Sequence, residues 1–170
     1  MPIFIETLDD LTYTILSDHG FTLPTKKFFN FEVMACNDAH VALISGNTEY
    51  DPLYEIVIGG WWNLRSAIRM YKQQIIPRVI ISGTFLECNE YKEFWVYWNS
   101  TTVVIGQEST MNVFLTWSKQ SGLRQVENIG IHTGFGSEGK WIFHNSGNGY
   151  KISDGQMLCL FGVFLESIKI

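Results

Sequence analysis

Alternation of apolar and polar residues recurs along almost the whole of this 170-residue chain, while the 3.6-residue spacing of an amphipathic helix is nearly absent. A period of two is typical of strands, because successive side chains point to opposite faces of a sheet. The stretch Phe28–Ala35 is the first clear example, and Phe94–Trp98 with Thr102–Ile105 forms an aromatic hairpin pattern. No helical period is long enough to connect parallel strands. The alternation therefore predicts an all-β domain.

Roughly ten short strands are expected, separated by turn residues. They are Phe28–Ala35, His40–Ser45, Tyr54–Ile58, Arg78–Phe85, Phe94–Trp98, Thr102–Ile105, Val113–Trp117, Asn128–His132, Trp141–His144 and one or two strands within Met157–Lys169, with another around Leu11–Leu16. Trp61–Met70 is expected to continue a strand after a glycine bulge, although one helical turn is the alternative. Such a series predicts a single antiparallel β-sandwich, jelly-roll-like, over residues 1–170.

The composition fits a large interior and excludes some partners. Charged residues make up only 17% of the chain, against about 25% in an average domain, and aromatic residues make up 15%. The net charge is −5 and the basic residues are scattered, with Lys26–Lys27 as the one adjacent pair. We therefore expect no nucleic-acid partner and no footprint for an anionic membrane. No apolar run approaches the roughly 18 residues of a membrane span.

The three cysteines, Cys36, Cys88 and Cys159, are widely spaced and odd in number. Buried thiols are the favoured interpretation, and one disulfide plus one free thiol is the alternative. The sequence Asn99-Ser100-Thr101 is a glycosylation sequon at the expected hairpin tip, which weakly favours secretion. The first residues, MPIFIETLDD, lack the pattern of a signal peptide. An extracellular location is favoured, and a cytoplasmic one stays open.

Little in the chain suggests catalysis, and no catalytic residue, metal or cofactor is expected. Gly134, Gly136 and Gly139 form a literal G-x-G-x-x-G, but Lys140–His144 after it alternates as a strand, whereas a dinucleotide site requires a helix there. These glycines are expected to make a tight hairpin connection. The histidines have no metal-ligand spacing, so a metal site would require strands to bring them together. Cys88 lies between acidic residues and is a poor nucleophile.

The segment from Asn37 to Arg69 is richest in recognition chemistry. Paired tryptophans at a strand end, with amide and guanidinium groups beside them, suit a sugar, because an indole packs on the apolar face of a pyranose while polar groups bond its hydroxyls. The predicted ligand-binding residues are Asp38, His40, Trp61, Trp62, Asn63, Arg65 and Arg69. In the alternative, structural interpretation, Trp61 belongs to the core and Arg69 pairs internally with Glu55.

The same motifs resemble a known family. The stretches NDAHVALIS, YEIVIGGWWNLRSAIR, CNEYKEFWVYW and IHTGFGSEGKW are similar to the domain family named after farnesoic acid O-methyltransferase, over roughly residues 28–145. Two departures stand out. Trp62 occupies a position where that family usually has glycine, and Phe135 one where it usually has tryptophan. These changes bear on the ligand that this chain would bind.

The resemblance implies two different functions. The family name implies methyl transfer from S-adenosylmethionine to a sesquiterpene acid, whereas the domain's occurrence as a module of extracellular animal proteins implies adhesion. Because the chain lacks a strand–glycine loop–helix unit, we expect a non-enzymatic, lectin-like protein of an invertebrate that binds glycans or glycoproteins. A protein-interaction module is the first alternative and the methyltransferase the second. Homo-oligomers are expected, since single sugar sites bind weakly.

Overall fold

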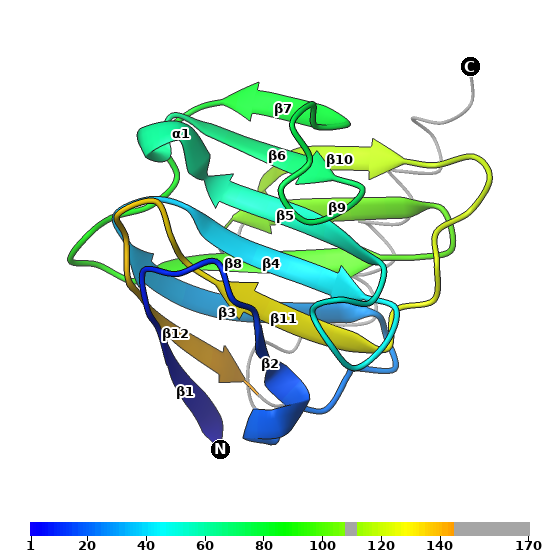
Figure 1. Cartoon of the computed structure of the whole chain (residues 1–170), viewed down its shortest axis with the longest axis horizontal. Coiled ribbons are helices and arrows are strands. Elements are labelled where there is room, and N and C mark those ends of the chain that lie inside the picture. The colour runs from blue at the N-terminus through cyan, green and yellow to red at the C-terminus, as the bar shows by residue number, and fades with distance from the viewer. Residues whose placement is uncertain (108–111, 145–170) are drawn as a thin grey trace.

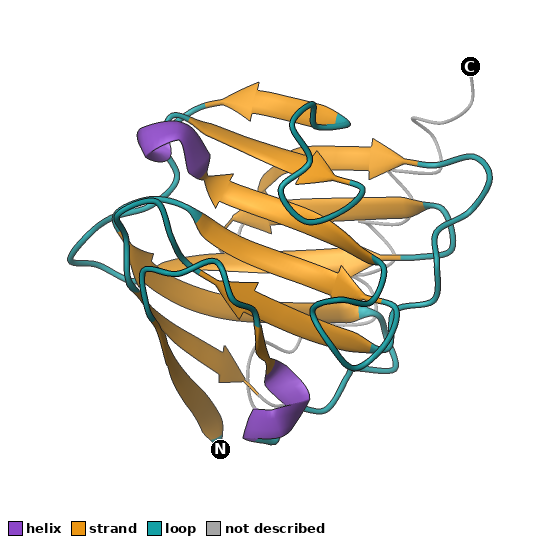
Figure 2. Ribbon diagram, in the orientation of Figure 1, coloured by secondary structure: helices purple, strands orange, loops and turns teal. Residues whose placement is uncertain are grey.

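The computed structural model describes residues 1–107 and 112–144, which form two stacked antiparallel sheets (Figure 1 and Figure 2). The strand order is β1-β12-β3-β8-β9-β10 in the first sheet and β2-β11-β4-β5-β6-β7 in the second. The first sheet comprises β1 (Pro2–Thr7), β12 (Gly139–His144), β3 (Phe28–Ala35), β8 (Lys92–Trp98), β9 (Thr102–Gln107) and β10 (Asn112–Ser118). The second comprises β2 (Thr14–Ile15), β11 (Asn128–His132), β4 (Ala39–Ile44), β5 (Leu53–Gly59), β6 (Arg65–Arg69) and β7 (Val79–Ser82). The predicted all-β sandwich is confirmed.

The only helical elements in the described residues are two four-residue turns, η1 (Leu16–His19) and α1 (Gly60–Asn63). Neither is long and apolar enough to cross a membrane. Two expected strands, 28–35 and 128–132, match β3 and β11 at both ends. The strand expected around Leu11–Leu16 shrinks to β2, and β1 was not expected at all. The strands expected within Met157–Lys169 lie outside the described residues.

The core lies between the two sheets and is strongly aromatic. Phe31, Phe94, Trp141 and Phe143 are fully buried, and the rings of Phe31 and Trp141 lie 5.7 Å apart. Burying one such side chain stabilises the fold by about 1.5–3 kcal/mol. Buried residues alternate with more exposed ones along β3 and β12, so the period of two that identified these strands also builds the core.

The central strands of the second sheet, β11, β4 and β5, are buried on both faces, which is unusual for an antiparallel sheet. Every residue of β4 and β5 is buried. Val41 and Ile56 point into the core, whereas His40 and Glu55 lie on the opposite, outer face. Buried polar residues on that outer face therefore need partners there.

Two expectations about connections are wrong. Residues after β5 do not continue the strand, because α1 reverses the chain and β6 returns antiparallel to β5. The glycine-rich stretch 133–138 is not a hairpin, because β11 and β12 belong to different sheets and it carries the chain between them. The strand expected after the glycines is nevertheless present as β12.

The favoured interpretation of the cysteines is also wrong for two of them. Cys36 and Cys88 form a disulfide that joins the end of β3 to the loop before β8, and both residues are exposed. The two cysteines are 52 residues apart, so their spacing along the chain does not indicate that they pair. Cys159 lies outside the described residues.

Candidate ligand-binding end of the sandwich

Three turns that carry the sequence motifs meet at one end of the sandwich. We call them the Asp38 turn (36–38), the Trp turn (59–64) and the glycine loop (133–139), and together they form the motif end. The Asp38 turn touches both of the others. Asp38 N–H donates to the Gly59 carbonyl at 2.8 Å. On its other side, Cys36 N–H donates to Ser137 Oγ at 3.1 Å.

Backbone strain is concentrated at this end. Seven non-glycine residues in the described part of the chain have positive φ, and five of them are in these three turns. The five are Asp38 (52°), Trp61 (52°), Trp62 (60°), Asn63 (62°) and Phe135 (53°). Positive φ is a genuine outlier for a bulky side chain, and such strain tends to persist at binding and active sites.

The Trp turn is held in its strained shape by specific contacts. Asn63 Oδ1 accepts from the N–H groups of Phe85 and Leu86, both at 3.0 Å, and its Nδ2 donates to the Leu86 carbonyl at 2.8 Å. Glycine is needed at Gly60, because a Cβ there would lie 2.7 Å from Val57 Cγ1. Trp62, in the middle of this turn, is 81% exposed.

The glycine loop presents a second aromatic side chain. Phe135 is 57% exposed, and its ring stacks against the buried His40 ring at a centroid distance of 6.3 Å. The next residue, Gly136, has a φ of 89° and donates its N–H to Asp9 Oδ1 at 2.9 Å. The loop thus holds an exposed phenyl ring directly over one of the predicted site residues.

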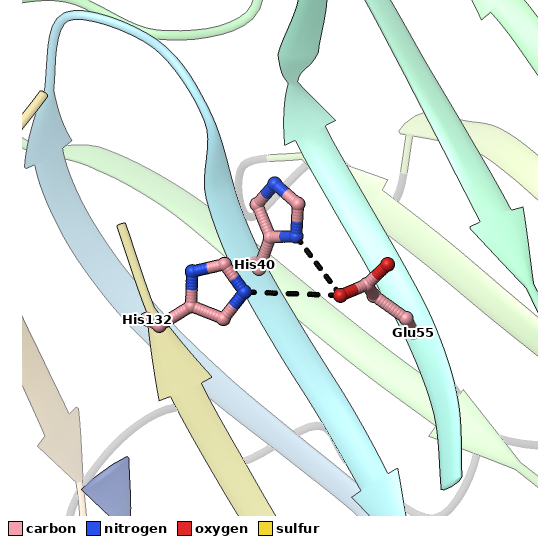
Figure 3. A group of neighbouring side chains, drawn as sticks. All are labelled: His40, Glu55 and His132. Carbon is pink, nitrogen blue, oxygen red and sulfur yellow. Dashed lines mark ion pairs between the residues drawn. The ribbon is translucent and has the colours of Figure 1, made fainter. Parts of the chain in front are cut away.

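Beneath these turns, the outer face of the second sheet contains a buried charge cluster, composed of Tyr13, Asp38, His40, Glu55, Arg69 and His132. Figure 3 shows its centre, where His132 on β11, His40 on β4 and Glu55 on β5 converge. Glu55 Oε1 lies 3.2 Å from His40 Nδ1 and 3.7 Å from His132 Nε2. The three side chains have no exposed surface.

The remaining partners of Glu55 complete the cluster. Tyr13 Oη donates to Oε1 at 2.8 Å, and Arg69 Nη1 binds Oε2 at 2.9 Å. Gln73 N–H also donates to Oε2 at 2.9 Å. Trp61 covers Arg69, with the guanidinium carbon 5.3 Å from the ring centroid. Glu55 is therefore a fully bonded buried anion, balanced by a buried cation.

The environment of the cluster shifts its pKa values in different directions. Burial alone would raise the pKa of Glu55, but His132, His40 and Arg69 hold that pKa well below its ordinary 4.5. Burial also opposes a proton on His40, yet bonds to Asp38 and Glu55 outweigh burial and raise its pKa. The pKa of His132 is lowered, first by burial and then by the neighbouring His40. Burial, followed by the Glu55 charge, raises the pKa of Tyr13.

The central triad also has the residue types of a metal site. One ligand atom each from His40, Glu55 and His132 lies within 4.8 Å of the others. The two imidazole rings, however, stack face to face, with centroids 4.2 Å apart and planes 29° apart. Lone pairs lie in the ring planes, so stacked rings do not aim at one ion. Both Glu55 oxygens are engaged as well, and the geometry fits a charge cluster better than a metal site.

The seven predicted site residues fall into three groups. Trp62 and Arg65 are exposed, and Trp61 is half-buried at the motif end. Asp38, His40 and Arg69 belong to the buried charge cluster, where Arg69 has the internal Glu55 partner considered as an alternative. Asn63 bonds the backbone of the 85–86 segment. Whether any of them contacts a ligand stays a prediction.

Four residues of this region were outside the predicted set: Tyr13, Glu55, His132 and Phe135. His132 is the last residue of β11 and Phe135 lies within the glycine motif that follows it, so their place at the end of a strand was the available signal. Tyr13 was not detectable, because it reaches the cluster from a segment with weak periodicity.

The family profile described as Farnesoic acid O-methyl transferase matches residues 9–146. The chain belongs to this family. "Uncharacterized protein 5" of Haliotis asinina is 28% identical over 103 residues, which make up 60% of this chain and only 59% of that relative.

Among solved structures, similarity is found to sheep galectin-11 in complex with glycerol, with 6% identity and a TM-score of 0.46 over 73% of this chain and 97% of the galectin. Bacillus licheniformis β-glucanase has 12% identity and a TM-score of 0.48 over 72% and 67%. A Ruminococcus gnavus sialidase module, CBM40 bound to α2,3-sialyllactose, has 7% identity and a TM-score of 0.42 over 93% and 97%. Similarities this distant carry no information about the ligand of this family member.

Proposed function

We propose that this domain binds glycans at the motif end, with Trp62 and Phe135 as its stacking surfaces. The observation that carries the proposal is the pair of exposed aromatic side chains held at positive φ by tightly bonded turns. Each such residue costs about 1–2 kcal/mol of backbone strain. Both rings are exposed, so packing in the core does not offset this strain. Strained and exposed rings favour a binding role over a packing role.

Sugars suit the groups presented at this end. An exposed ring offers a flat apolar face for the C–H face of a pyranose. Arg65, the first residue of β6 directly after the Trp turn, is exposed and can donate hydrogen bonds to the hydroxyls of the sugar. The buried charge cluster fixes His40 beneath Phe135 and Arg69 beneath Trp61. We infer that the cluster positions these rings and that Asn63 holds the turn.

We expect a non-enzymatic protein. The glycine loop leads into strand β12, whereas a nucleotide-type cofactor requires a helix N-terminus after its glycines. The Cys36–Cys88 disulfide supports an extracellular setting, because disulfides persist in oxidising compartments. A homo-oligomer remains part of the proposal, for avidity, and light scattering would then report at least twice the mass of one chain.

A glycan array tests the proposal, with wild type beside Trp62→Ala and Phe135→Ala. Tyr50→Ala is the matched control, because Tyr50 is 90% exposed and lies in the loop between β4 and β5. Wild type and Tyr50→Ala should bind the same sugars, whereas each motif-end variant should lose about tenfold or more in affinity. Unfolding curves confirm that all variants are folded.

Failure to bind any glycan would refute the proposal, as would equal binding by wild type and both motif-end variants. Titration calorimetry with S-adenosylmethionine separates the methyltransferase alternative. Binding at micromolar affinity would favour that alternative, and no heat of binding is the expected result.

A further inference from the structure

Acidic residues are absent from one long segment of this acidic chain. Between Glu55 and Glu87 there is no Asp or Glu, so all 17 acidic residues lie outside residues 56–86. The segment contains four cations, Arg65, Arg69, Lys72 and Arg78. The net charge of −5 sums over the whole chain and hides this uneven distribution of charge. For that reason, the overall charge predicted no binding to an anionic membrane.

The same segment concentrates exposed apolar side chains. Twelve large hydrophobic residues are exposed in the described part of the chain, and six of them lie between residues 62 and 80. They are Trp62, Leu64, Tyr71, Ile75 (91% exposed), Ile76 (77% exposed) and Ile80. Single exposed apolar residues are ordinary, whereas exposed apolar residues that share one face are typical of an interaction surface.

Strand register places one of these apolar residues and two of the cations on the same face. Ala67 pairs with Ile80 and Arg65 with Ser82, so alternation puts Arg65, Ile80 and Arg78 on the same outer face. Figure 1 shows α1 at one end of β6 and the β6–β7 loop at the other. Trp62 and Leu64 therefore flank this face at one end, and the loop with its isoleucines flanks it at the other.

The β6–β7 loop is anchored rather than loosely attached. Gln73 N–H donates to Glu55 at 2.9 Å, Met70 N–H donates to Gln74 Oε1 at 2.7 Å, and Arg78 N–H donates to the Ile68 carbonyl at 2.8 Å. These bonds fix both ends of the loop while its two adjacent isoleucines face solvent.

Two of the four cations are available to a partner. Arg69 is bound to Glu55, and Lys72 Nζ lies 2.7 Å from Glu49. Arg65 and Arg78 are exposed, and neither has an ion pair within residues 1–107 and 112–144. Two guanidinium groups thus flank an apolar face.

We propose that this β6–β7 face docks on an anionic lipid bilayer. Ile75 and Ile76 would enter the interfacial region, while Arg78 and Arg65 meet lipid phosphates. Trp62 and Tyr71 suit the headgroup level, where amphipathic rings gather. Charge complementarity favours this partner over a second copy of the chain, since two such faces would bring like charges together. Aliphatic side chains also lack the flat ring face that sugars use.

Sedimentation of the full chain with lipid vesicles tests the proposal. Vesicles of phosphatidylcholine alone are compared with vesicles that also contain phosphatidylserine. The chain should sediment with the anionic vesicles, and raising salt from about 0.1 M to about 0.5 M should weaken this binding. The Ile75→Ser/Ile76→Ser double variant should lower the partition constant about tenfold or more, and Arg78→Gln about fivefold.

Matched controls are Leu8→Ser, at a side chain 66% exposed elsewhere, and Lys140→Gln on β12, both of which should bind as wild type does. Equal binding to neutral vesicles, no binding to either kind, or full binding by the double isoleucine variant would overturn the proposal. Competition by soluble glycerophosphoserine would also overturn it, because a headgroup site rather than a bilayer surface would then be responsible. Glycan binding by the isoleucine variant reports independently on the motif end.

Discussion

Trp62 adopts a backbone conformation that is unfavourable for a tryptophan. Its φ of 60° and ψ of 41° suit glycine, the residue that the family pattern usually has at this position. The side chain is 81% exposed, so packing returns little of the strain energy. A residue that is both strained and exposed is best explained by a contact with another molecule.

We predict that Trp62→Gly is more stable than Trp62→Ala by about 1 kcal/mol, because glycine alone adopts this conformation without strain. Both variants should lose glycan binding. Urea unfolding measures the two free energies. The same pair of substitutions at Tyr50, which does not have positive φ, should give glycine no advantage. A Trp62→Gly variant less stable than Trp62→Ala would contradict the strain argument.

Turns and strands differ in how far the sequence determines them. The strands were predictable because a period of two identifies them locally, as Phe28–Ala35 and Asn128–His132 show. The Trp turn was mistaken for a bulged strand. No local pattern indicates that three consecutive residues, none of them glycine, adopt left-handed backbone angles there. The Arg69–Glu55 pair could be considered from the sequence. The whole charge cluster could not, because it depends on how five separate segments of the chain come together.

The Cys36–Cys88 disulfide acts at the scale of elements, because it ties the Asp38 turn to the segment that Asn63 also bonds. Replacing both cysteines with serine should lower the free energy of unfolding by about 2–4 kcal/mol, since a closed loop of this length restricts the unfolded chain. Denaturant titration measures the loss. Both proteins carry Cys159→Ser, so that no third thiol can exchange. A difference below about 0.5 kcal/mol would show that the bridge is unimportant for stability.

At the scale of the whole molecule, the buried charge cluster makes stability depend on pH. The pKa of His40 is raised above its ordinary 6.5, so its contribution is complete below pH 6.5 and is lost as pH rises through the folded-state pKa. The pKa of His132 is lowered, so the folded protein takes up fewer protons than the unfolded chain below pH 6.5 and loses stability there. The two contributions together place a maximum near neutral pH.

We predict that the free energy of unfolding falls on both sides of about pH 6.5, with Glu55 adding a further loss below its ordinary pKa of 4.5. His132→Gln should flatten the curve just below pH 6.5, and His40→Gln should flatten it above pH 6.5. Urea titrations at a series of pH values measure the curves. Variant curves parallel to the wild-type curve would contradict the proposed coupling.

The central claim, that Trp62 at the motif end contacts a glycan, can be tested through the six tryptophan indole N–H signals in a proton–nitrogen NMR spectrum. Single Trp→Phe variants assign the signals, and the tightest glycan from the array is then titrated into the labelled protein. The Trp62 signal should shift with saturation. The Trp141 signal should stay, because that indole is buried and donates to Thr7 Oγ1 at 2.9 Å. A glycan that binds while the Trp62 signal stays in place and another indole shifts would contradict the account.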